Sequence, residues 1–152
     1  MKSQVLKPKI YCLHYNECNH SKCTSRKLNR LNLLTIIKKI ESPLYKAIIL
    51  NPFSQKILSI DDREKILKHG LIVIDCSWKN ILKLKDLISI NSRKLPSLIA
   101  VNPVNFGKWE KLSSAEAIAA ALYITKFEDY SKLILSKFSW GSEFFNINYK
   151  KK

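Results

Sequence analysis

The fold is decided by residues 71–78, which read Leu-Ile-Val-Ile-Asp-Cys-Ser-Trp. The first four side chains are apolar on both faces of an extended chain, as in a central parallel strand with helices above and below it. The apolar run ends at Asp75, and ligands of open α/β sheets bind outside the carboxyl ends of the strands. We therefore expect a parallel sheet with a binding crevice beside Asp75.

The flanking segments predict an α/β protein in two parts. Further strands are expected at residues 9–15, 46–50, 55–60 and 98–101. Helices are expected at residues 28–40, 61–68 and 78–90. Gly70 marks a helix end, and the pattern from Ser113 to about Tyr149 is helical. We predict an α/β domain with a parallel sheet over residues 1–92 and a mainly helical domain over residues 93–152.

Residues 93–121 join a buried strand to a helix through a loop rich in turn residues. Ser113 and Glu116 have the spacing of a capping box, in which the two side chains bond each other's backbone N–H groups at a helix start. Loops of this kind often bind ligands because rigid elements hold their ends. We expect this loop to share the crevice at Asp75.

Asp75 and Trp78 each allow two interpretations. Asp75 could accept a proton if its surroundings disfavour its charged form, or it could cap the following helix. Trp78 could pack in the core or form an aromatic wall for a purine or a methyl group. Cys76 and Ser77 lack the partners that activate a nucleophile, so covalent catalysis is not expected.

The cysteines near the N-terminus resemble a metal site in composition but not in spacing. Cys12, Cys18 and Cys23 stand close to His14 and His20, but five and four residues separate the cysteines. Structural zinc sites favour closer pairs such as C-x2-C. We therefore expect no metal, with Cys12 packed as a small apolar side chain and the thiols reduced.

The chain is strongly basic, with 27 Lys and Arg against 12 Asp and Glu and a formal charge of +15. This excess indicates a polyanion as the partner, and nucleic acid fits better than a membrane surface because no isolated basic amphipathic helix is present. The candidate phosphate contacts are Lys22, Arg26, Lys27, Arg30, Arg93 and Lys94. No run of about 18 apolar residues occurs, so we expect a cytoplasmic protein.

Seven short motifs are spaced along nearly the whole chain. They are Lys-Cys-Thr-Ser-Arg-Lys-Leu at 22–28, Leu-Asn-Pro at 50–52, Asp-Cys-Ser-Trp at 75–78, Arg-x-Leu-Pro at 93–96, Asn-Pro-Val-Asn-Phe-Gly at 102–107, Leu-Ser-x-x-Glu-Ala at 112–117 and Phe-x-Trp-Gly at 138–141. In this order they resemble the small-subunit (16S/18S) ribosomal RNA aminocarboxypropyltransferase family, in its archaeal form. That family usually has Gly where Ser25 stands and Tyr where Phe106 stands.

The resemblance implies both a fold and a reaction. The fold would be SPOUT-like, with the C-terminal region threaded as a deep trefoil knot. The reaction would transfer the 3-amino-3-carboxypropyl group of S-adenosylmethionine to N3 of a uridine or pseudouridine in small-subunit ribosomal RNA, in ribosome biogenesis. Methylthioadenosine would leave. We expect a monomer acting on the RNA or on a precursor particle, without a membrane.

The resemblance also assigns residues to the donor. The adenine and the methyl group would lie against Leu50, Pro52, Trp78, Leu98, Leu112 and Ala117. The ribose would bind near the backbone of Ile74, and the amino-acid end near Thr24 and Ser114. Asp75 would accept the N3 proton and lie beside the sulfonium.

Two other functions fit the same sequence. A SPOUT-type RNA methyltransferase would use the same donor, because the choice of carbon depends only on how the donor is oriented. A non-catalytic RNA-binding assembly factor would explain the charge and the lack of a nucleophile, and it would have no affinity for the donor.

Overall fold

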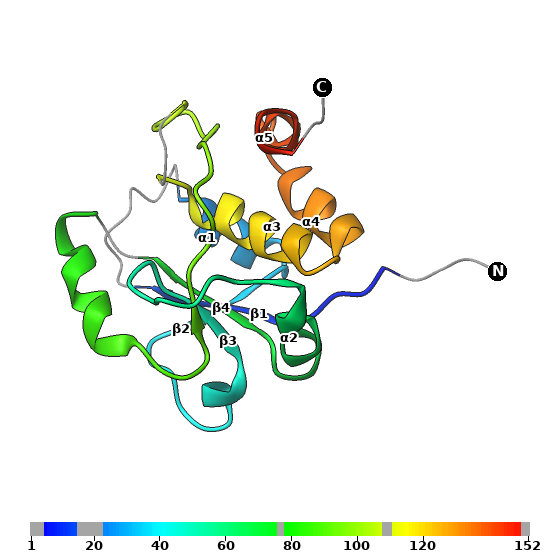
Figure 1. Cartoon of the computed structure of the whole chain (residues 1–152). Coiled ribbons are helices and arrows are strands. Elements are labelled where there is room, and N and C mark those ends of the chain that lie inside the picture. The colour runs from blue at the N-terminus through cyan, green and yellow to red at the C-terminus, as the bar shows by residue number, and fades with distance from the viewer. Residues whose placement is uncertain (1–4, 15–22, 76–77, 108–110, 150–152) are drawn as a thin grey trace.

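The computed structural model describes residues 5–14, 23–75, 78–107 and 111–149. Five parallel strands form one sheet in the order β2-β1-β4-β3-β5 (Figure 1). The strands are β1 Ile10–His14, β2 Thr35–Ile37, β3 Ile48–Leu50, β4 Leu71–Asp75 and β5 Ser92–Arg93. The α-helices are α1 Thr24–Arg30, α2 Arg63–His69, α3 Ser114–Ile124, α4 Glu128–Leu135 and α5 Gly141–Asn148, and the 3-10 helices are η1 Leu44–Lys46, η2 Ile60–Asp62 and η3 Trp78–Leu87.

The strand predicted from residues 71–75 is confirmed as β4, the middle strand of the sheet. It pairs with β1 on one side and with β3 on the other. Leu71, Ile72 and Val73 are buried, although successive side chains of a strand point to opposite faces of the sheet. Both faces of the sheet are therefore shielded from solvent at β4. Gly70 precedes it with φ 103°, a conformation that favours glycine and ends α2 directly before the strand.

The two faces of the sheet are covered differently. Leu71 and Val73 face the main core, which α1, α3, α4 and α5 close from one side in Figure 1. Ile49 and Ile72 face a smaller cluster that is covered by Ile40 and other residues of the 37–44 region. The expectation of helices on both faces holds only in part among the described residues, because this cluster is covered by a connecting segment and by Leu44, the first residue of the 3-10 helix η1.

The helix predicted over residues 28–40 is wrong beyond its first turn. Helix α1 ends at Arg30, and Asn32 has a positive φ of 61°. The chain then forms β2, which pairs with β1 through Thr35–Ile37. The apolar residues do repeat at helical spacing, but β-branched side chains such as Ile36 fit a pleated strand better than a helix.

Two predicted strands are also wrong. Residues 55–60 contribute only an isolated bridge between Ile57 and Lys94. Residues 98–101 lie outside the five strands, and the fifth strand is β5 instead. Leu98 and Val101 are buried in the main core, so their apolar run reflects burial, while Ile99 forms no more than an isolated bridge.

The other predicted helices agree with the structure in outline. Residues 61–68 fall in η2 and α2, and a capping box formed by Ser59 and Asp62 opens η2. Residues 78–90 are helical as η3, a 3-10 helix over Trp78–Leu87. Residues beyond Ser113 form α3, α4 and α5, as predicted. None of the helices in these described parts has the length and apolar character needed to cross a membrane.

The predicted domain boundary at residues 92 and 93 falls inside β5, whose two residues are Ser92 and Arg93. The main core combines residues from both sides of that boundary, including Leu71 from β4 and Ile118 from α3. The helical part therefore packs directly on the sheet and shares its core.

Arg93 lies in the interior, which corrects its assignment as a phosphate contact. It is 4% exposed. Its Nε donates to Asp62 Oδ1 at 3.1 Å, and its Nη1 donates to the carbonyl oxygens of Ile90 and Ser92 at 2.9 Å each. All of these contacts are internal, so Arg93 ties the sheet edge to the start of α2.

Replacing Arg93 tests this structural role. Arg93→Met leaves the Asp62 carboxylate buried without its partner, and breaking a buried ion pair costs about 3–5 kcal/mol. We expect that loss in the free energy of unfolding measured with a chemical denaturant. The control Lys94→Met, at the neighbouring partly exposed position, should change it by less than about 0.5 kcal/mol. Equal stability of the two variants would contradict the role.

Candidate functional site

A cavity of about 490 Å³ opens at the carboxyl ends of β3 and β4. Its walls come from these strand ends, from the segment after β5 and from the start of α3. The lining residues are Leu50, Asn51, Pro52, Ile57, Val73, Ile74, Asp75, Leu84, Lys94, Leu95, Pro96, Ser97, Leu98, Leu112, Ser113, Ser114 and Ala117. A mainly apolar cavity with a few converging polar groups is typical of a small-molecule site.

The parallel sheet explains why these walls meet. Strands that run in one direction end at one edge, so Leu50, Asp75 and Lys94 lie close together although they are far apart in the sequence. Asn51 fixes the turn after β3, since its side chain donates to the carbonyl of Leu84 at 2.8 Å and accepts from the N–H of Phe53 at 3.0 Å.

The loop before α3 is fixed by a fully buried carboxylate, Glu116. Glu116 Oε2 accepts from the N–H of Val101 at 2.6 Å, and Oε1 accepts from the side chain of Asn102 at 2.7 Å and from the N–H of Ser113 at 2.9 Å. The predicted capping box of Ser113 and Glu116 is confirmed. Because Ser113 and Ser114 also line the cavity, the N-terminus of α3 and its positive dipole end face the cavity.

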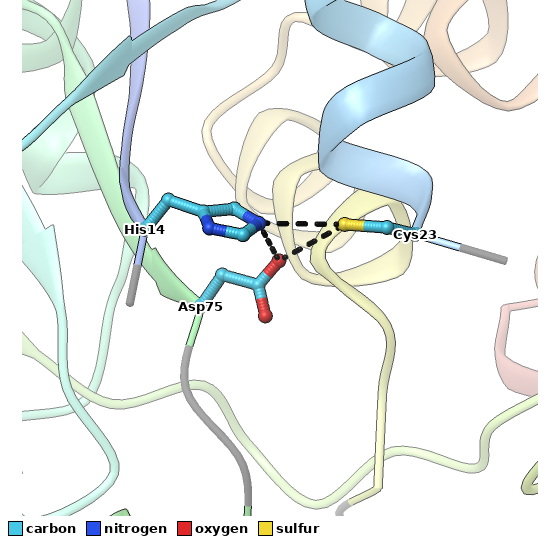
Figure 2. A group of neighbouring side chains, drawn as sticks. All are labelled: His14, Cys23 and Asp75. Carbon is cyan, nitrogen blue, oxygen red and sulfur yellow. Dashed lines mark hydrogen bonds and ion pairs between the residues drawn. The ribbon is translucent and has the colours of Figure 1, made fainter. Parts of the chain in front are cut away.

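Asp75 stands at the end of β4 inside a polar cluster (Figure 2). Its Oδ2 accepts from the hydroxyl of Ser25 at 2.7 Å and lies 3.5 Å from Nε2 of His14 and 3.6 Å from Sγ of Cys23. The His14 side chain is 1% exposed and the Asp75 side chain 19% exposed. The cluster thus lies behind Asp75, while Asp75 itself reaches the cavity.

The same cluster is the one group in the described part of the chain with the atoms of a metal site. The ligating atoms of His14, Cys23 and Asp75 lie within 4.8 Å of one another. Cys23, however, is disulfide-bonded, so its sulfur is no thiolate, and the expectation that this cysteine is reduced is wrong. Burial, with a smaller contribution from the Asp75 carboxylate, raises the pKa of Cys12 to about 12, which keeps its thiol protonated.

The cavity brings together eight of the ten residues predicted to hold the donor. These are Leu50, Pro52, Ile74, Asp75, Leu98, Leu112, Ser114 and Ala117. Thr24 is outside the lining, and its hydroxyl accepts from the N–H of Ala115 at 3.1 Å, which joins the starts of α1 and α3. The side chain of Trp78 is outside the described residues.

The residues predicted to contact phosphate lie in different parts of the structure. Lys94 lines the cavity. Arg26 and Arg30 lie on α1, where Arg30 is exposed. Lys27 donates to the carbonyl of Lys137 at 2.7 Å and stands 4.8 Å from the ring centre of Phe138, so it binds α1 to the C-terminal helices. Lys22 is outside the described residues.

Sequence reasoning considered His14 and Cys23 together but did not place them beside Asp75, and it missed part of the cavity wall. His14 shares a face of β1 with Cys12, which the alternation in residues 9–15 could have indicated. Leu84 enters the cavity from η3, and Leu95 and Pro96 belong to a motif already noted in the sequence. No signal in the sequence could have placed Ser25 beside Asp75, because 50 residues separate them.

Comparisons with known proteins agree along most of the chain. Residues 48–151 match the family described as ribosome biogenesis protein, C-terminal. The 16S rRNA aminocarboxypropyltransferase of Methanocaldococcus jannaschii is 41% identical over 147 residues, which cover 96% of this chain and 86% of that protein. The protein of the same name from Methanosphaera stadtmanae is 44% identical over 142 residues, covering 92% and 83%.

A solved structure gives the same relationship. The SAM-dependent rRNA:acp-transferase of Vulcanisaeta distributa superposes with a TM-score of 0.85 at 34% identity, covering 93% of this chain and 78% of that one. Residues 8–39 also match a model described as a possible Fer4-like domain in RNase L inhibitor. The protonated Cys12 and disulfide-bonded Cys23 do not fit a cluster held by cysteine thiolates.

Sequence identity, coverage and structural similarity therefore all relate this chain to aminocarboxypropyltransferases that act on rRNA. The match to the Methanocaldococcus jannaschii protein covers more than nine tenths of this chain. It therefore includes the sheet, the cavity at the strand ends and the capped start of α3. This protein belongs to the 16S rRNA aminocarboxypropyltransferase family.

Proposed function

We propose that this protein transfers the 3-amino-3-carboxypropyl group of S-adenosylmethionine to N3 of a uridine or pseudouridine in small-subunit ribosomal RNA. The observation that carries the proposal is the position of Asp75, a carboxylate at the edge of an apolar cavity large enough for a nucleoside. The relatives are named for this transfer to 16S rRNA, and the structural neighbour is named as dependent on the same donor.

The cavity walls suit the two ends of the donor. Leu50, Pro52, Leu98, Leu112 and Ala117 offer apolar surface to the adenine and the methyl group. Ser114 stands in the first turn of α3, where backbone N–H groups and the positive dipole end favour a carboxylate. We assign the donor's amino-acid end to this helix start, and the ribose to the backbone near Ile74.

The proposed step needs one proton acceptor and a fixed direction of attack. The N3 proton passes to Asp75, N3 bonds to the carbon of the carboxypropyl chain next to sulfur, and that carbon–sulfur bond breaks. The electron pair of the broken bond stays on sulfur, which becomes the neutral thioether of methylthioadenosine. Because the sulfonium carries three carbons, the pocket must bury the methyl group and turn the other chain toward the base.

The RNA would approach the mouth of the cavity. Lys94 lines the cavity, and Arg26 and Arg30 lie on α1, which carries Ser25 next to Asp75. A formal charge of +15 supports contacts to the phosphate backbone. Recognition would then depend on RNA shape and on unpaired bases that can be turned into the cavity.

We also propose that the chain is knotted in the SPOUT-like manner. After the edge strand β5 the chain returns to the middle of the sheet, where α3 packs on β4 and α1. The Ala115–Thr24 hydrogen bond joins segments 91 residues apart. Pulling on both ends of the unfolded chain tests the knot: a knotted chain stops short of its full extended length of about 3.3–3.6 Å per residue. Extension to that length would contradict the knot.

Product analysis tests the proposed reaction and the role of Asp75 together. With S-adenosylmethionine and unmodified small-subunit ribosomal RNA, the wild type should release methylthioadenosine. Asp75→Asn should still bind the donor by calorimetry, more weakly than the wild type because the charge beside the sulfonium is lost. It should release methylthioadenosine roughly 10²- to 10⁴-fold more slowly at saturating donor, because an amide cannot take the proton.

The products separate the alternatives. Release of S-adenosylhomocysteine by the wild type would indicate methyl transfer and contradict the proposed reaction. A rate for Asp75→Asn equal to that of the wild type would contradict the assignment of the proton acceptor alone.

A further inference from the structure

The Asp75 carboxylate is held on one of its two oxygens. Its oxygen Oδ2 lies within 3.6 Å of polar atoms of Ser25, His14 and Cys23, and the shortest of these distances is the 2.7 Å hydrogen bond from Ser25. Figure 2 shows Oδ2 turned toward His14 and Cys23 and the second oxygen turned away from both. Asp75 also lines the cavity, and we take its second oxygen as the acceptor on that side.

Ser25 is the strongest of the three partners of Oδ2. His14 Nε2 lies at 3.5 Å, beyond the range of a strong hydrogen bond. Cys23 Sγ lies at 3.6 Å and has no proton to donate, because this sulfur is disulfide-bonded. The Ser25 hydroxyl has one proton, and a carboxylate accepts it better than the disulfide sulfur of Cys23, which lies 3.0 Å away. Ser25 is fully buried, so solvent does not compete for its hydroxyl in the folded protein.

We propose that Ser25 is a positioning residue for the transfer, which fixes the Asp75 carboxylate so that its second oxygen meets the N3 proton. This inference rests on the proposed function of Asp75. Ser25 is the second residue of α1, a helix tied to the core by Leu28. The rigid helix start therefore sets where the hydroxyl lies, and the hydroxyl sets the rotation of the carboxylate.

Ser25→Ala tests the inference because it removes only the hydroxyl. We expect kcat for transfer to RNA to fall roughly ten- to a hundredfold, the effect of one charge-assisted hydrogen bond, while the KM for S-adenosylmethionine stays unchanged. The matched control is Ser131→Ala, which also removes a fully buried hydroxyl, here one that donates to the Ala119 carbonyl at 2.6 Å in the helical layer.

A double substitution asks whether Ser25 acts through Asp75. In the Asp75→Asn background, Ser25→Ala should cause no further fall in kcat, because the proton acceptor is already absent. Ser25→Thr, which keeps the hydroxyl, should retain more of the rate than Ser25→Ala. If Ser25→Ala does not fold, Ser25→Gly replaces it, since it also removes the hydroxyl.

The outcomes separate this inference from the proposed function. Full activity of Asp75→Asn overturns the acceptor role, and the inference falls with it. An inactive Asp75→Asn together with a Ser25→Ala enzyme as fast as Ser131→Ala overturns the positioning role alone. A Ser25→Ala enzyme that loses donor affinity and stability along with kcat, or that lowers the rate further in the Asp75→Asn background, also overturns it.

Discussion

Parallel pairing of β1 with β4 is the constraint on which the rest of the site depends. Five residue pairs set this register and place His14 opposite Asp75. A slip of one residue would turn the apolar side chains of β4 to the wrong face of the sheet and carry Asp75 away from Ser25. The burial of Leu71 and Val73 in the main core therefore also fixes the carboxylate in the cavity. Fold stability and site geometry share one cause.

The chain as a whole is basic, whereas the cavity contains an acidic residue. The excess of basic residues gives a long-range attraction for RNA, whereas the cavity holds a carboxylate among apolar walls. Arg93 shows that a basic residue near the cavity need not serve the RNA, since the Asp62 carboxylate and two carbonyls already bind its guanidinium. In the proposed reaction Asp75 is the charged group that faces the base, and the sulfonium would balance its charge.

How far the sequence predicted this structure depends on the kind of signal. The β4 strand and the capping box of Ser113 and Glu116 were predictable because each depends on neighbouring residues. The β2 strand and the segment at 98–101 were mispredicted because an apolar pattern reports burial and does not identify the partner. The burial of Arg93 was missed because it depends on Asp62, which lies 31 residues away. Ser25 was missed for the same reason, since its contact is made only after folding.

The central claim is that the pocket selects which carbon of the donor reacts. The direct measurement uses S-adenosylmethionine labelled in its carboxyl carbon and, in a separate reaction, in its methyl carbon, each with small-subunit ribosomal RNA that lacks the modification. The account predicts that the carboxyl label enters the RNA and the methyl label leaves with methylthioadenosine. Methyl label in the RNA, without carboxyl label, would contradict it.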